Sequence, residues 1–279
     1  MLIVDSQVHV WGRNTPQRPW PADGVGREQR PEPVTAGVLL AAMDEGGVDR
    51  AILVPPSWEG DRNDLALAAA QAQPDRFAVM GRLPLDARQT EREVLVQHWR
   101  EQPGMLGLRF TFHVPHQKVW LRDGTADWIW PAAEKAGVPI MVFPPGSLDA
   151  FEPIAARHPG LKLVIDHIGL ANDKKDAGAF WELPRALALA KYPNVAVKAS
   201  ALPCFSSEPY PYPALHPFLK QVFDAFGPRR MFWGTDWSRL PCTYAQAITL
   251  FTEELPWLRA DDLELVMGRG MCEFLDWQI

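Results

Sequence analysis

Apolar and polar residues follow one another in blocks along this chain, with short, nearly continuous apolar runs separated by longer stretches of helical periodicity. We interpret eight of these runs as strands of a parallel sheet, because strands covered on their outer face carry few polar residues. The predicted strands cover residues 2–9, 50–56, 77–83, 105–112, 139–144, 161–168, 195–201 and 231–237.

Helical patterns lie between most of these strands. The first begins after Thr35, a good N-cap residue, and ends at Gly46-Gly47, where glycine allows the turn that closes many helices. The predicted helices are 35–46, 61–73, 124–136, 147–158, 179–191, 214–226, 243–254 and a closing helix at 260–275. Strands that alternate with helices in this way predict a (β/α)8 TIM barrel that forms one domain over residues 1–279.

Two connections are unusually long for a compact domain. Residues 11–34 follow the first strand and residues 202–214 follow the seventh, and both are rich in proline. Long loops of this kind are usually functional. Because both follow a strand, we expect them on the carboxyl-terminal face of the barrel, where active sites of this fold form.

Composition narrows the cellular role. The net charge of −6 argues against non-specific nucleic-acid binding, and no apolar stretch is long enough to span a membrane or resembles a secretion leader. The three widely spaced cysteines favour a reducing compartment and a packing role, so we expect a cytoplasmic protein. The pattern leaves the oligomeric state open, a homo-oligomer included.

Polar side chains end several of the predicted strands. His9, Arg109, His167 and Asp236 follow the first, fourth, sixth and eighth strands. A carboxylate at the end of a buried apolar strand is costly unless it has a partner or a function. Any one of these residues could simply fill the end of the barrel, but together they predict a single reaction pocket.

The residues around these strand ends suggest the ligand. Arg109 ends an apolar strand and is the best candidate to bind a carboxylate with two hydrogen bonds, whereas each loop arginine could equally be solvated or paired. We therefore expect a small anionic molecule as the partner. Further candidates for substrate binding are His113, Ser57 as a hydrogen-bonding group, and the aromatic residues Trp11 and Trp237.

Five short motifs occur in barrel order: Asp5-x-Gln7-x-His9-x-Trp11, Gly107-x-Arg109-Phe110, Ile165-Asp166-His167-Ile168-Gly169, Lys198-x-Ser200 and Gly234-Thr235-Asp236-Trp237. Together they make the chain resemble the amidohydrolase-2 family of TIM barrels. The resemblance is greatest to its lactonase-like branch, which includes 2-pyrone-4,6-dicarboxylate lactonase and sugar lactonases.

This resemblance implies roles for three residues. Asp236 corresponds to the general base that activates water, and His9 and His167 correspond to the histidines that polarise the lactone carbonyl without a metal. Metal-dependent relatives use two strand-one histidines, a strand-five histidine and the aspartate. Here Gln7 replaces the first histidine and residues 139–144 contain none.

That departure leads us to expect no cofactor, since an amide oxygen is a poor substitute for an imidazole ligand. Gln7 could instead donate its amide N–H to the substrate. If Zn or Mn were bound, the ligands would be His9, His167 and Asp236.

The sequence therefore predicts a hydrolase that opens a carboxylate-bearing lactone with Asp-activated water. One alternative is a metal-dependent, non-oxidative decarboxylase of an aromatic or unsaturated acid. A second is an inactive barrel that binds a small anionic metabolite.

Overall fold

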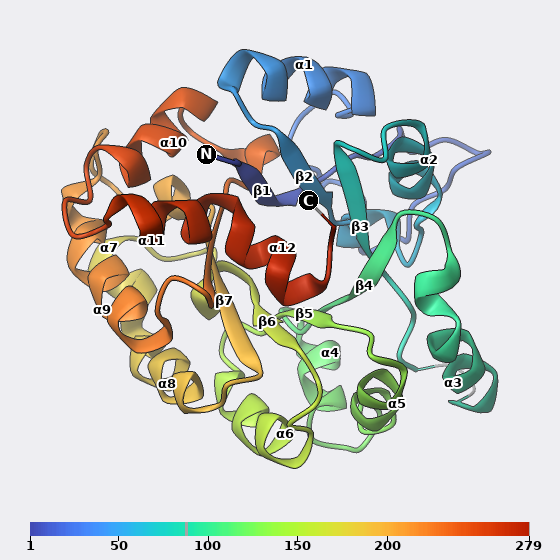
Figure 1. Cartoon of the computed structure of the whole chain (residues 1–279). Coiled ribbons are helices and arrows are strands. Elements are labelled where there is room, and N and C mark those ends of the chain that lie inside the picture. Colours follow the sequence, from blue (N-terminus) through green and yellow to red (C-terminus); the bar gives the residue numbers. More distant parts are fainter. Residues whose placement is uncertain (87–88, 279) are drawn as a thin grey trace.

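Eight parallel strands form a barrel surrounded by helices in the computed structural model, which describes residues 1–86 and 89–278 (Figure 1). Neighbouring strands pair in chain order from β1 to β8. Their bounds are β1 Val4–Val8, β2 Arg50–Leu53, β3 Phe77–Gly81, β4 Met105–Thr111, β5 Ile140–Phe143, β6 Leu163–Ile165, β7 Val195–Ser200 and β8 Met231–Gly234. The predicted TIM barrel is confirmed.

Strand β8 returns to β1 through contacts just beyond its end. The Asp236 amide donates to the Gln7 carbonyl at 2.8 Å, and the Thr235 amide donates to Asp5 Oδ1 at 2.9 Å. Gly234 allows this approach, because a Cβ at that position would collide with β1. These contacts bring the ends of β1 and β8 together at one face of the barrel.

Most predicted helices are found. Seven α-helices lie inside the predicted ranges: α1 Ala36–Gly46, α2 Asp64–Ala72, α5 Ile129–Ala136, α6 Phe151–Arg157, α8 Leu183–Ala188, α9 His216–Phe226 and α10 Tyr244–Thr252. The closing segment divides into α11 Ala260–Glu264, a π-helical turn over Leu265–Arg269 and α12 Gly270–Leu275.

The prediction was incomplete or wrong in two respects. It missed α3 Gln89–Gln97, α4 Pro115–Trp120 and α7 Asp176–Ala179, which are short and carry little apolar periodicity. It also extended β2, β6 and β8 by three residues each at their carboxyl ends; in β6 and β8 the chain leaves the strand at Asp166 and at Thr235. Both strands end early because the residues that follow adopt left-handed backbone conformations.

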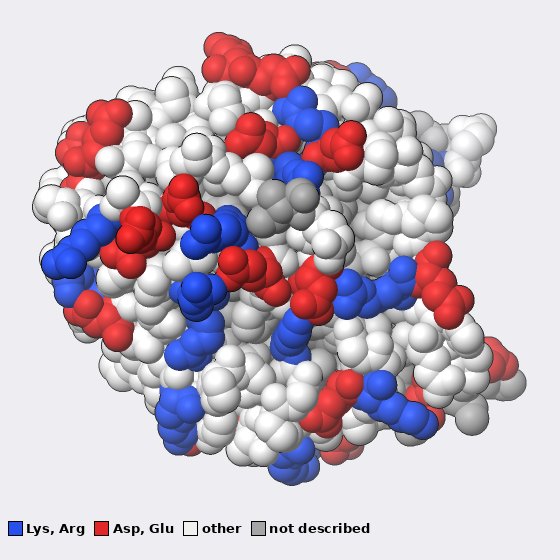
Figure 2. Space-filling view, in the orientation of Figure 1, with Lys and Arg blue, Asp and Glu red and all other residues white. Residues whose placement is uncertain are grey.

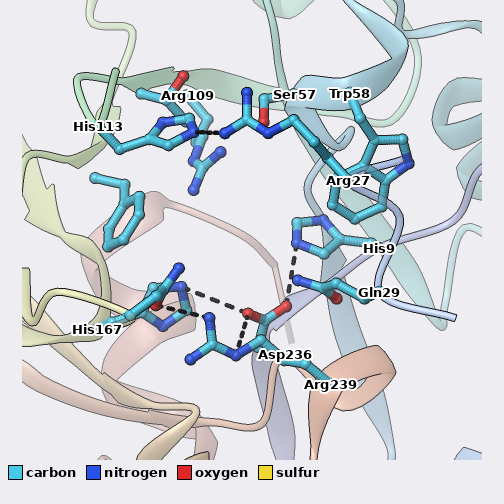
Figure 3. Close-up of a pocket in the computed structure, with 13 residues that line it drawn as sticks. His9, Arg27, Gln29, Ser57, Trp58, Arg109, His113, His167, Asp236 and Arg239 are labelled. Carbon is cyan, nitrogen blue, oxygen red and sulfur yellow. Dashed lines mark hydrogen bonds and ion pairs between the residues drawn. The ribbon is translucent and has the colours of Figure 1, made fainter. Parts of the chain in front are cut away.

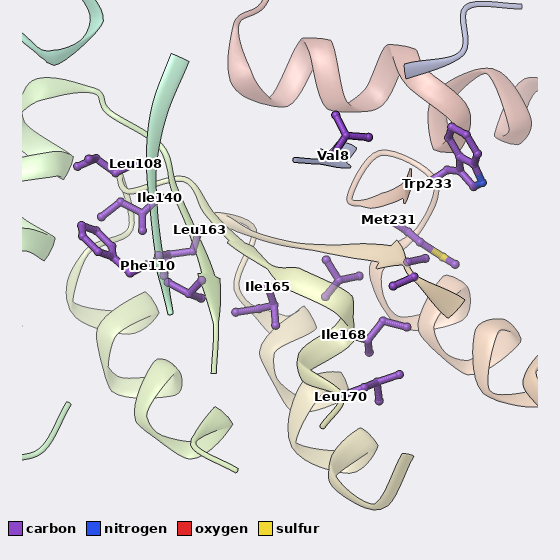
Figure 4. Packing of buried hydrophobic residues seen from close by; sticks show 14 of the residues in the cluster. Val8, Leu108, Phe110, Ile140, Leu163, Ile165, Ile168, Leu170, Met231 and Trp233 are labelled. Carbon is purple, nitrogen blue, oxygen red and sulfur yellow. The ribbon is translucent and has the colours of Figure 1, made fainter. Parts of the chain in front are cut away.

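The core has two parts. A large cluster lies between the strands and the surrounding helices, and part of it is shown in Figure 4. A smaller cluster fills the barrel interior and includes Val4, Phe232 and the α12 residues Met271 and Leu275.

Helix α12 crosses the end of the barrel at which the strands begin, and it faces the viewer in Figure 1. The same face carries interspersed acidic and basic side chains (Figure 2). Because α12 covers this end, the opposite end of the barrel, where the strands finish, is the one left open for a site.

Within the described residues no helix is long and apolar enough to cross a membrane.

Candidate active site

A polar pocket of about 340 Å³ lies at the carboxyl-terminal ends of the strands (Figure 3). It brings together six residues that the sequence predicts for the site: His9, Ser57, Arg109, His113, His167 and Asp236. Its wall also contains residues that the sequence did not single out as site residues: Arg27, Gln29, Trp58, Thr111, Phe143, Asn172 and Arg239.

Two of the central residues sit on unusual backbone. His167 and Asp236 each have a φ of 52°, in the left-handed region that residues other than glycine seldom adopt. Such conformations persist only where the surrounding structure enforces them, and they are frequent at functional sites. At both positions the turn that ends the strand places a polar side chain in the pocket wall.

Asp236 lies between the two histidines. Its Oδ1 atom is 3.1 Å from His9 Nε2, and its Oδ2 atom is 3.7 Å from His167 Nε2. The side chain is almost completely buried, with His9 beside Oδ1 and His167 beside Oδ2. A carboxylate oxygen has more than one lone pair, so Oδ1 can accept a proton from a bound molecule as well as contact His9.

Neighbouring charges keep this carboxyl ionised. Burial alone would raise the pKa of Asp236, but His9 and Arg239 outweigh that effect and hold the pKa well below its usual range. Arg239 contributes through its Nε atom, 3.6 Å from Asp236 Oδ2. Asp236 therefore carries a negative charge at neutral pH.

The two histidines differ in their surroundings. His9 Nδ1 is 2.5 Å from the Val54 carbonyl, which can only accept, so this nitrogen carries a proton and Nε2 faces the pocket. His167 Nδ1 is 2.8 Å from the Ser200 hydroxyl. Burial lowers the pKa of His167 to about 3, so it is neutral at physiological pH.

A buried charge network forms the floor beneath the pocket. Asp166 binds Lys198 Nζ through Oδ1 at 2.6 Å and accepts a hydrogen bond from Arg109 Nε through Oδ2 at 3.0 Å. All three side chains are buried. Two cations share one carboxylate, so the network leaves a net positive charge below the pocket.

Gln7 belongs to this floor rather than to the pocket wall. Its Oε1 atom accepts a hydrogen bond from Lys198 Nζ at 2.5 Å, and the residue is fully buried. Gln7 is not among the residues that line the pocket. Its Nε2 atom has no hydrogen-bond partner among the described residues, and donation from this atom to a substrate stays a prediction.

The two predicted aromatic residues also lie behind the wall. Trp11 is buried and packs edge-on against Trp58 at 5.4 Å, and it is Trp58 that lines the pocket. Trp237 stacks on Tyr244, with the Arg30 guanidinium 4.1 Å from its ring centre. Neither tryptophan is among the residues that line the pocket, and contact with a substrate stays a prediction for both.

The pocket wall is strongly basic. Arg27 reaches over from the loop after β1 and lies 2.6 Å from His113 Nε2, while Arg239 Nη1 donates to Asn172 at 2.7 Å. Arg109 uses only its Nε atom for Asp166, which leaves its terminal amino groups for a ligand. Three arginines and one carboxylate therefore surround the space, which favours an anionic ligand.

A metal ion would need donors from the same residues. His9, His167 and Asp236 supply two imidazoles and one carboxylate, a set that catalytic zinc can use. However, the two histidines face different oxygens of Asp236, and no three His, Cys, Asp or Glu side chains of residues 1–86 and 89–278 are arranged to hold a metal.

The two other positions at which a metal ligand was expected supply no free donor atom. Strand β5 ends in Phe143, and the Gln7 amide oxygen is bound to an ammonium group. Two nearby cations, Lys198 and Arg239, also make it costly to place a dication here. The residues present do not fit a conventional zinc or manganese site.

Comparison with known proteins places this geometry in context. The model of the amidohydrolase family matches residues 4–269. An L-fucono-1,5-lactonase from Burkholderia ambifaria is 28% identical over 249 residues, which cover 84% of this chain and 79% of that protein.

Two solved structures share the fold. An amidohydrolase from Burkholderia multivorans with bound zinc has a TM-score of 0.79 at 23% identity, covering 99% of both chains. A probable 2-pyrone-4,6-dicarboxylic acid hydrolase from Acinetobacter baumannii has a TM-score of 0.73 at 20% identity, covering 99% of this chain and 100% of that one.

Proposed function

This chain belongs to the amidohydrolase family and is a hydrolase, and we propose that it opens a carboxylate-bearing lactone with water activated by Asp236. One observation carries the proposal: a buried, ionised carboxylate faces a basic pocket between two histidines. The similarity to a lactonase supports the reaction class.

In the proposed reaction, a water molecule lies against Asp236 Oδ1. As its oxygen bonds to the lactone carbonyl carbon, Asp236 takes one of its protons. Because a carboxyl with so low a pKa is a weak base, the carbonyl must be strongly polarised. His9, when both of its ring nitrogens carry a proton, and the nearby arginines would stabilise the oxyanion. Cleavage of the acyl–oxygen bond then returns the proton from Asp236 to the ring oxygen and gives an open-chain hydroxy acid.

Arg109 is proposed to bind the substrate carboxylate. Its Nε atom is fixed by Asp166, and its terminal amino groups remain for a ligand within the pocket. A guanidinium held at one end and open at the other is well suited to two parallel hydrogen bonds with a carboxylate.

Asp236→Asn tests the base directly. Asparagine keeps the shape and tolerates the left-handed backbone, so we expect a folded variant whose kcat falls by about 10²–10⁴-fold. Its melting temperature should also fall, because the buried ion pairs with His9 and Arg239 are lost. Asp176→Asn is the matched control, because Asp176 also has a positive φ, of 49°, but lies outside the pocket. Full turnover by Asp236→Asn on a panel of lactones would overturn the mechanism.

Metal independence is a separate part of the proposal. We expect purified protein with metal well below one equivalent to hydrolyse its lactone equally well before and after chelation. Activity that appears only after Zn or Mn is added, on aromatic acids instead of lactones, would favour the decarboxylase. Thermal stabilisation by anions without any turnover would favour a binding protein.

A further inference from the structure

A second cavity of about 400 Å³ adjoins the reaction pocket. The two cavities share three wall residues: His113, Phe143 and Asn172. The rest of its wall comes from α4 and from the segments that follow β5 and β6. The two cavities therefore lie side by side, and a ligand seated near Asp236 would extend past His113, Phe143 and Asn172 to enter the second one.

Lys118 of α4 supplies a cation to this second cavity. Its side chain is half-buried, and its Nζ atom makes no hydrogen bond or ion pair with any residue of the described chain. An ammonium group with no carboxylate beside it needs water or a ligand to complete its hydrogen bonds.

The neighbouring loop makes room for this ammonium group. A Cβ on Gly146 would lie 3.0 Å from Lys118 Nζ, so the ammonium group occupies the space beside this glycine, whose φ of +75° disfavours a larger residue. The Gly146 amide donates to the buried Glu182 carboxylate at 2.6 Å, which fixes the loop in place. The cavity is thus shaped around the lysine.

A second lysine and an aromatic ring form the outer wall. Lys174 Nζ lies 4.7 Å from the ring centre of Trp181, whose side chain is 49% exposed. Asp173 also lines the cavity, so the lysines exceed the carboxylates by one. An extended, negatively charged ligand arm would meet complementary charge here.

We propose that the substrate carries a second anionic group on an arm that occupies this cavity, with Lys118 and Lys174 as its binding residues. This rests on the proposed function, and it specifies a substrate longer than a lactone ring with one carboxylate. The terminal group is a carboxylate or a phosphate, since both suit a lysine ammonium.

Linear dicarboxylates of increasing length, from succinate to azelate, are suitable probes. Each is compared with the monocarboxylate of equal length by isothermal titration calorimetry. We expect a chain long enough to reach both cavities to bind at least 10-fold more tightly than its monocarboxylate. Carboxyalkyl phosphonates of the same length then distinguish a carboxylate subsite from a phosphate subsite.

Lys118→Met should remove this gain for long dicarboxylates and leave the binding of short ones unchanged. Lys174→Met should reduce the same gain. Lys135→Met is the matched control, because it removes an exposed charge from α5, outside both cavities. Melting temperatures verify that each variant is folded.

A gain that is absent at every length, or that survives Lys118→Met, would show the inference to be wrong. The assay measures binding, so it remains informative even if no lactone is hydrolysed. Conversely, the protein would keep its proposed function if it hydrolysed simple lactones but bound long dicarboxylates no more tightly than monocarboxylates. That result would refute only the second anionic group of the substrate.

Discussion

Replacing Lys198 by methionine tests the charge network under the pocket. The change keeps an unbranched side chain, one heavy atom shorter, and removes the ammonium group. In the folded protein this group contacts Asp166 Oδ1 at 2.6 Å, Gln7 Oε1 at 2.5 Å and the Ser6 carbonyl at 3.3 Å. All of these acceptors are buried, so water cannot replace the lost contacts without a structural change.

The expected loss follows from these contacts. Removing one partner of a buried ion pair usually destabilises a protein by about 3–5 kcal/mol. Because Arg109 still neutralises Asp166 from its other oxygen, we expect the lower end, about 3 kcal/mol. At about 2–4 °C per kcal/mol for a domain of similar size, the melting temperature should fall by about 6 °C or more.

Calorimetry or thermal unfolding followed by circular dichroism measures this shift. Lys162→Met is the matched control: Lys162 pairs with Asp276 at 2.6 Å, but its side chain is 35% exposed, so the loss should be at most about 1 kcal/mol. Equal shifts in Lys198→Met and the control would refute a charged Lys198 in the floor.

Three further outcomes are expected. The pKa of His167 is lowered to about 3, so the unfolded chain takes up a proton from about pH 6.5 downward while the folded chain does so only near pH 3. Stability should therefore decline across this range by up to about 1.4 kcal/mol per pH unit from this residue, and the decline between pH 7 and pH 5 should be smaller in His167→Asn. Gly234→Ala should destabilise the barrel by about 1–3 kcal/mol, because its Cβ meets the buried Ser6 hydroxyl and lies close to Asp5 Oδ1 and the Ser6 amide of β1. Gly81→Ala should cost less, since its Cβ meets the flexible end of Met105, and equal melting temperatures would contradict this. Arg109→Met should raise KM for a carboxylate-bearing lactone more than for its neutral analogue, and an equal rise for both would argue against carboxylate binding.

The fold could be predicted because its strands are nearly all apolar and its helices mostly amphipathic. The errors have physical causes. Helix α3 is mainly polar, so its pattern is weak. The ends of β6 and β8 were misjudged because His167 and Asp236 take left-handed conformations, which residue type alone does not reveal.

The candidate site was predictable at the strand ends and less so elsewhere. His9, Arg109, His167 and Asp236 converge as the barrel requires. Gln7 does not follow simple strand alternation, because the pairing of β1 with β2 shifts register between Asp5 and Val8. The sequence placed Lys198 in a motif but assigned it no role. Its contact with Gln7 joins residues that are 191 positions apart and forms only when the barrel closes.

Arg27 and Arg239 illustrate a different limit. Arg27 reaches His113 through the conformation of a long loop, across 86 residues of sequence. Arg239 enters the wall through the turn that follows β8. Loop conformation is set by tertiary contacts, so neither position could be assigned from local sequence.

The buried network of Lys198, Asp166 and Arg109 has a consequence for ionic strength. Dissolved ions screen exposed charges over about 8 Å at physiological salt but reach buried charges much less. The attraction of the floor for an anion should therefore persist in concentrated salt, whereas that of the exposed Lys174 should fade. Added salt would thus weaken the hold on the outer part of a long anionic ligand while its inner part stayed bound.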